Sequence, residues 1–138
     1  MNSPTVPAAA PVTPLAAAHP VDIRHIDEAE CRRFQGSVEL VGRRWSAAIM
    51  LAVARGGERF SEIRASVTGI SDRLLSQRLR ELEDADLVER VVVPTTPVQI
   101  RYRLTERGAD LMRALQPVVA WGQRWKPPLP EESARAAG

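Results

Sequence analysis

The segment that decides the fold is Ser61–Ala85, which reads SEIRASVTGISDRLLSQRLRELEDA. Its first part predicts a short helix over 61–67, in which Ser61 is the expected N-cap. Thr68-Gly69-Ile70 indicates a tight turn, and Ser71 is expected to cap a second helix that runs to about Ala85. Two short helices joined by a turn that contains glycine are typical of a helix-turn-helix, whose second helix enters the major groove of DNA.

The second helix has two chemically different sides. At about 100° per residue, Leu75, Leu79 and Leu82 fall within one narrow arc that must face a core. The opposite side holds four hydrogen-bond donors: Arg73, Ser76, Gln77 and Arg80. Arginine suits guanine, glutamine suits adenine, and serine suits phosphate or either base type. The alternative is an ordinary solvated helix face.

Three neighbours of this face have other expected roles. Arg78 falls beside the leucine arc, so we expect it to pair with a nearby acid rather than read a base. Ser71, at the helix N-terminus, is expected to bind a phosphate, whereas Asp72 would repel one and is expected to cap the helix or aim Arg73.

Two strands follow, over 87–93 and 98–104, with 94–97 as the hairpin tip. Val98, Ile100, Tyr102 and Leu104 alternate with polar residues, which predicts a half-buried strand. Arg101 and Arg103 share the opposite face, and Arg90 is expected to join them from the partner strand. Such a wing suits phosphates or the minor groove. Ser61, at the start of the helix over 61–67, is a further candidate phosphate donor. The alternative is that these arginines shield a sheet surface.

Helices are predicted on both sides of this unit. The apolar spacing indicates helices over 28–43 and 45–54, with Gly56-Gly57 ending the second and Phe60 in a short extended piece. Thr105 is expected to cap a long helix that reaches about Trp125. The fold class is therefore mostly α with a small β-wing, a winged helix-turn-helix. We expect a disordered Pro/Ala-rich leader over 1–23, one domain over 24–126 and a disordered tail over 127–138.

Composition excludes several classes of protein. The chain has 138 residues and a net charge of +2, but residues 31–126 hold 17 basic side chains against 11 acidic ones, which favours an anionic partner. The sequence has no apolar run long enough for a membrane span. A single cysteine, Cys31, excludes an internal disulfide and a cysteine-cluster metal site, so no metal or other cofactor is expected. A thiol enzyme would need a base near Cys31, and only His25 is nearby, so we expect no enzyme.

The ordered set of motifs resembles the HxlR-type family of bacterial winged-helix transcriptional regulators over Cys31–Trp125, about two-thirds of the chain. The matching segments are Val38–Trp45, Arg59–Arg64, Gly69–Leu82, Leu87–Arg90, Pro94–Val98 and Tyr102–Gly108. The resemblance implies a cytoplasmic homodimer that binds a palindromic operator in double-stranded DNA, with the first and last helices forming the dimer interface. The residues expected there are Phe34, Val38, Leu111, Leu115, Val118, Val119 and Trp121. The alternative is that this apolar stripe belongs to the chain's own core.

Cys31 is expected just before the first helix, where members of this family often carry a cysteine that in several cases senses oxidants or electrophiles. Here Arg32-Arg33 follows, where the family commonly has proline first. Two guanidiniums and a helix N-terminus favour a reactive thiol, and Glu30 opposes it. The alternative is a buried cysteine that acts as a small hydrophobe.

Two other functions remain open from the sequence. The first is a winged-helix module for protein–protein contact without DNA readout, which an apolar face on residues 73–80 would have favoured. The second is a regulator controlled by a small-molecule effector, held among Trp45, Tyr102, Trp121 and Trp125.

Overall fold

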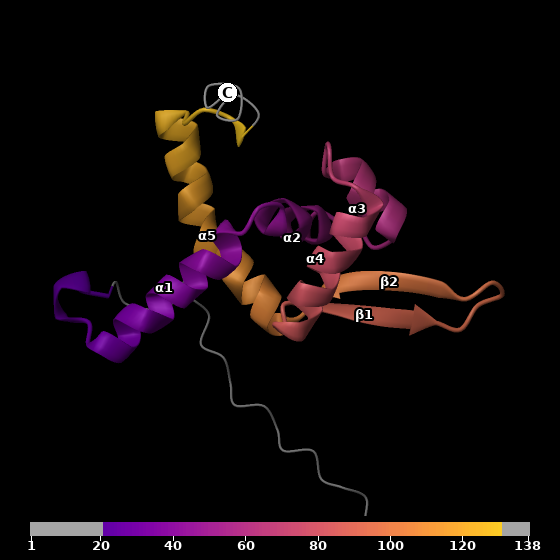
Figure 1. Ribbon diagram of the computed structural model, residues 1–138, viewed down its shortest axis with the longest axis horizontal. Coiled ribbons are helices and arrows are strands. Elements are labelled where there is room, and N and C mark those ends of the chain that lie inside the picture. Colours follow the sequence, from indigo (N-terminus) through magenta and orange to yellow (C-terminus); the bar gives the residue numbers. More distant parts are fainter. Residues whose placement is uncertain (1–20, 131–138) are drawn as a thin grey trace, which may run out of the picture.

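A computed structural model describes residues 21–130, and the expectations for 1–20 and 131–138 lie outside the described residues. The elements in chain order are η2 (Ile23–His25), α1 (Glu28–Gly42), α2 (Ser46–Ala54), α3 (Phe60–Ser66), α4 (Asp72–Asp84), β1 (Val88–Val93), β2 (Gln99–Leu104) and α5 (Glu106–Trp125). Figure 1 shows α2, α3, α4 and the hairpin as one body, from which α1 and the far end of α5 project. The predicted class, mostly helical with a two-stranded wing, is confirmed.

The core lies where the helix-turn-helix meets α2 and the first strand. Leu75, Leu79 and Leu82 of α4 are all buried, as their shared arc predicts. Ile49 and Met50 of α2 pack in the same cluster. The remaining members of the buried cluster are Ala52, Val53, Ile63, Val67, Ile70, Leu87 and Val88. The leucine side of α4 is therefore buried in the core, and the opposite side of the helix faces solvent.

Side-chain caps fix where two helices begin. The Ser71 hydroxyl accepts a hydrogen bond from the Leu74 amide at 3.2 Å, and the Thr105 hydroxyl accepts one from the Gly108 amide at 3.0 Å. Both caps were expected, because serine and threonine oxygens satisfy the free amides of a first turn. Gly69 has a φ of +89° in the turn before α4, a backbone conformation that glycine adopts without penalty.

The start of α3 differs from the expectation. Phe60 is the first residue of the helix rather than part of an extended piece, and Ser61 lies inside the first turn. The Glu62 carboxylate accepts hydrogen bonds from the backbone amides of Arg59 and Glu58, each at 3.0 Å. This carboxylate, and not the Ser61 hydroxyl, satisfies the free amides there.

The wing is an antiparallel pair in which Glu89 faces Arg103, Arg90 faces Tyr102 and Val91 faces Arg101. Directly paired residues share a face of a sheet. Arg90 therefore lies on the Tyr102 face, and the expectation that it joins Arg101 and Arg103 is wrong. Only the base of the expected apolar face is covered: Tyr102 and Leu104 pack on the core, whereas Val98 and Ile100 are exposed.

The helices α1 and α5 are only partly covered by the rest of the chain. In α1 no residue is buried, and Phe34 and Val38 are exposed. In α5, Leu111 packs against the chain's own core and Leu115 is half-buried. Farther along α5, which continues through Pro117, three large apolar residues are exposed: Val118, Val119 and Trp121.

Candidate nucleic-acid interface

The outer face of α4 is open. Arg73, Gln77 and Arg80 are exposed, and Ser76 is half-buried. The contacts that these side chains make lie along the helix itself: Gln77 Nε2 donates to Glu81 at 3.3 Å, and Arg80 Nε donates to the Ser76 carbonyl at 3.3 Å. No other element among residues 21–130 covers this row of donors, so a groove of DNA has access to it.

The N-terminus of α4 and the neighbouring helix α3 form the adjoining surface. Ser61, Arg64, Ser71 and Asp72 line one groove there. The Asp72 carboxylate pairs with the Arg64 guanidinium at 2.6 Å, so Asp72 neither caps α4 nor aims Arg73. Arg64 therefore lies beside the N-terminus of α4, in the same groove. The sequence analysis did not name Arg64, although a basic residue on the first helix of a helix-turn-helix could have indicated it.

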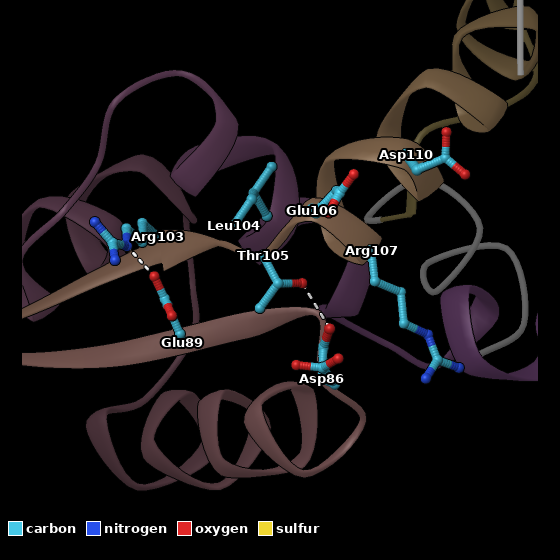
Figure 2. A pocket seen from close by; sticks show the side chains of 8 residues that line it. All are labelled: Asp86, Glu89, Arg103, Leu104, Thr105, Glu106, Arg107 and Asp110. Carbon is cyan, nitrogen blue, oxygen red and sulfur yellow. Dashed lines mark hydrogen bonds and ion pairs between the residues drawn. The ribbon is translucent and has the colours of Figure 1, made fainter. Parts of the chain in front are cut away.

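The two wing arginines that share a face, Arg101 and Arg103, are each paired with an acid. The Arg101 guanidinium contacts Glu58 at 2.9 Å, and Figure 2 shows Arg103 against Glu89 at the base of the wing. Arg90, on the other face, is exposed and makes no ion pair within the described part of the chain. Arg59, beside α3, donates to Gln99 at 3.3 Å and adds a basic group at this place.

Acidic residues gather away from the start of α4. Glu81, Glu83 and Asp84 stand in its last turns. Burial alone would raise the pKa of Glu81, but hydrogen bonds from Arg78 and Gln77 and the charges of Arg78 and Arg43 hold it below its ordinary value. Arg78 pairs with Glu81 at 2.9 Å, as expected. The charge of α4 is thus unequal along its length, with its first turns suited to an anion.

Cys31 lies inside the first turn of α1, within the helix predicted over 28–43, so its expected place just before the first helix is wrong. Its side chain is exposed, so the alternative of a buried hydrophobe is wrong. Of the two arginines that follow, Arg32 pairs with Glu28 at 3.1 Å. In residues 21–130 the structure shows no group of three potential metal ligands and no helix long and apolar enough to cross a membrane.

Comparison with known proteins decides the family. The model of the HxlR-like helix-turn-helix family matches residues 40–130. The chain belongs to this family. It is 42% identical over 98 residues to the HTH-type transcriptional regulator YvaP of Bacillus subtilis, covering 71% of this chain and 91% of that protein.

Solved structures agree with this membership in the HxlR family. The reduced form of the transcriptional regulator YodB from B. subtilis is 38% identical, with a TM-score of 0.64, and the match covers 69% of this chain and 93% of that one. The redox regulator HypR in its oxidized form is 29% identical, with a TM-score of 0.61, over 67% and 95% of the two chains. The chain is therefore a transcriptional regulator of the helix-turn-helix type and not an enzyme, as the sequence predicted.

Proposed function

We propose that this HxlR-family regulator acts as a homodimer that reads a palindromic operator, with α4 of each copy in the major groove. The observation that carries the proposal is the open row of Arg73, Gln77 and Arg80 on a helix whose other side is fully buried. Arginine and glutamine can each form paired hydrogen bonds with one base edge, guanine and adenine respectively. Ser76 lies in the same row but is half-buried, so its short side chain contacts a phosphate or base only where the DNA lies directly against α4.

The groups around α4 hold the phosphates in this proposal. Ser71 and the free amides of the first turn of α4 suit one phosphate, and Ser61 on α3 suits another. Arg101 and Arg103 keep their acidic partners in the free protein and exchange them for phosphates on binding. Arg90 reaches the backbone from the other face of the wing. Because each exchange costs an existing ion pair, we expect the wing to contribute less than α4.

The dimer contact in this proposal consists of α1 and the far half of α5, within a domain over 24–126. Phe34 and Trp121 are 66% and 55% exposed in the single chain. Val38, Val118 and Val119 are exposed on the same two helices, and Leu115 is half-buried. Leu111 serves mainly its own core. Exposed apolar side chains of this kind mark an interaction site, and in this proposal a second copy buries them symmetrically.

Control by oxidation at Cys31 is the second part of the proposal. Cys31 is exposed on α1, and a relative of similar fold is described as a redox regulator. An oxidant that takes two electrons and two protons from two Cys31 thiols, one per copy, leaves a disulfide between the copies. A Cys31→Ser variant that releases DNA under diamide as readily as the native protein would remove this part and leave the rest.

The experiment for DNA binding is selection of duplexes from a random library, followed by affinity measurement across a salt series. We expect enrichment of a two-fold symmetric sequence and an affinity that falls steeply with salt, because phosphate neutralisation releases counterions. Selection of no sequence, with binding instead to a protein partner, would favour the protein–protein module.

A further inference from the structure

The linker Arg43–Trp45 connects α1 to α2, and it contacts α4 at two places and the turn before α4 at a third. The Arg43 guanidinium lies 3.3 Å from the Glu81 carboxylate. The carbonyl of Arg44 accepts a hydrogen bond from Arg78 Nε at 3.1 Å. The ring of Trp45 packs at the turn before α4, where a Cβ on Gly69 would lie 3.6 Å from it.

Trp45 has an unusual backbone for its size. Its φ of +78° places it in the left-handed region, which bulky residues rarely adopt, and it stands as the N-cap of α2 without a capping side chain. Such strain persists only where surrounding contacts hold it. The contacts here are the turn at Gly69 on one side and the Arg44 guanidinium, 4.9 Å from the ring centroid, on another.

Arg78 is the centre of this arrangement. Its side chain is 12% exposed, and it turns toward the linker, away from the row of Arg73, Gln77 and Arg80. It donates to the Arg44 carbonyl through Nε and to both oxygens of Glu81 through Nη1, at 3.2 and 2.9 Å. Glu81 in turn contacts Arg43. One guanidinium therefore joins the backbone of the linker to an acid of α4, in the fork geometry that lysine does not reproduce.

We propose that Arg78 is a positioning residue that fixes the angle between α1 and the recognition helix α4, and thereby sets the spacing of the two half-sites that a dimer accepts. The inference rests on the proposed function, in which α1 carries the dimer contact. A two-fold reader places its recognition helices about one helical turn of DNA apart, roughly 34 Å, so a change of this angle changes the half-site spacing.

The test separates spacing from base reading. Duplexes that carry the selected half-sites at the selected spacing, and at one base pair more or less, are titrated with the native protein and with Arg78→Ala. We expect the native protein to prefer the selected spacing by about tenfold or more, and Arg78→Ala to bind all three within about twofold, with native penalties for a mismatch inside a half-site. Arg55→Ala, which changes an exposed arginine outside the linker, should behave as the native protein.

Two further variants keep the test decisive if Arg78→Ala does not fold. Arg78→Lys keeps the charge but not the fork, and Arg43→Ala removes the contact between the linker and Glu81. Each should reduce the spacing preference partially. Native spacing preference in all folded variants would overturn the inference while leaving the proposed function intact. A native protein that selects no sequence would instead overturn the proposed function.

The emission of Trp45 supplies a second readout. In a Trp121→Phe/Trp125→Phe chain, Trp45 is the remaining tryptophan. We expect Arg78→Ala or Arg78→Lys in this background to shift its emission toward that of a solvated indole, because the ring loses its fixed place beside Arg44 and Gly69. An unchanged spectrum, together with a relaxed spacing preference, would show that Arg78 does not act on the spacing through the linker, and would contradict the inference.

Discussion

Helices α4 and α1 are of similar length, 13 and 15 residues, but they differ in how far the rest of the chain buries them. In α4, Leu75, Leu79 and Leu82 are buried, so the position of this helix is set within one copy. In α1 no residue is buried, although Phe34 and Val38 are large and apolar. Removing exposed apolar surface from water lowers the free energy, so we expect α1 to pack against a second copy of the chain. In the proposed function, α4 therefore reads the DNA and α1 associates with a second copy.

The largest effect should come from Leu79 of α4, which is 1% exposed. Leu79→Ala removes buried methyl groups and leaves a cavity, so we expect the free energy of unfolding to fall by about 2–5 kcal/mol in urea titration. Leu51→Ala, at an exposed leucine of α2, is the matched control and should cost much less. Equal losses from the two variants would contradict the placement of the core.

Phe34 tests the other side of the comparison. Phe34→Ala should leave the unfolding of the isolated chain nearly unchanged but weaken association, because the ring is buried only between copies in the proposed dimer. Each copy then loses roughly 1.5 kcal/mol, which for two copies raises the dissociation constant about 100-fold. Sedimentation over a concentration series measures this. An unchanged dissociation constant would place the dimer contact elsewhere.

Two glycines of α5 show the same contrast within one helix, because Gly108 is packed against the chain and Gly122 is open. A Cβ on Gly108 would lie 1.9 Å from the backbone oxygen of Leu87, whereas a Cβ on Gly122 would meet nothing within 4 Å. Gly108→Ala should therefore destabilise the chain by about 1–3 kcal/mol, since backbone must move. Gly122→Ala should stabilise it by about 0.5–1 kcal/mol through helix propensity. Thermal unfolding of both variants checks this contrast, and a gain at Gly108 would refute it.

The smallest effect concerns the start of α3, beside α4. Hydrogen bonds from the backbone amides of Arg59 and Glu58 lower the pKa of Glu62 below its ordinary value of 4.5. A lowered pKa in the folded state adds stability that is present above pH 4.5 and lost as the pH falls through the lowered value. The stability difference between the native chain and Glu62→Gln should therefore shrink as the medium is acidified below pH 4.5.

The control for this pH effect is Glu83→Gln. Glu83 stands near the end of α4 and its replacement leaves the hydrogen bonds of Glu62 in place, so this variant should keep the acid-dependent loss of stability that Glu62 gives the native chain. A constant difference between the native chain and Glu62→Gln at every pH would contradict the capping role of Glu62.

Local patterns predicted α4 well, and contacts distant in sequence limited the prediction elsewhere. The Ser71 cap and the leucine arc depend only on neighbours along the chain, so the capping preference of serine predicted the first and helical periodicity predicted the second. The face of Arg90 depends on strand register, and the engagement of Arg101 depends on Glu58, 43 residues away. The cap of α3 was available in the sequence, because Glu62 stands three residues after Arg59, as in a capping box. The contact of Arg78 with the Arg44 carbonyl spans 34 residues, and no local pattern indicates it.

The most direct test of the reading role of α4 is the base preference of Arg73→Ala, compared with Arg55→Ala. Both arginines are exposed, but only Arg73 lies on the face proposed to enter the major groove. Affinities are measured for the selected duplex and for every single-base change in one half-site. We expect Arg73→Ala to lose about 1–3 kcal/mol of discrimination at one base position, and Arg55→Ala to lose none. Full native discrimination by Arg73→Ala at every position would contradict the proposed role of α4.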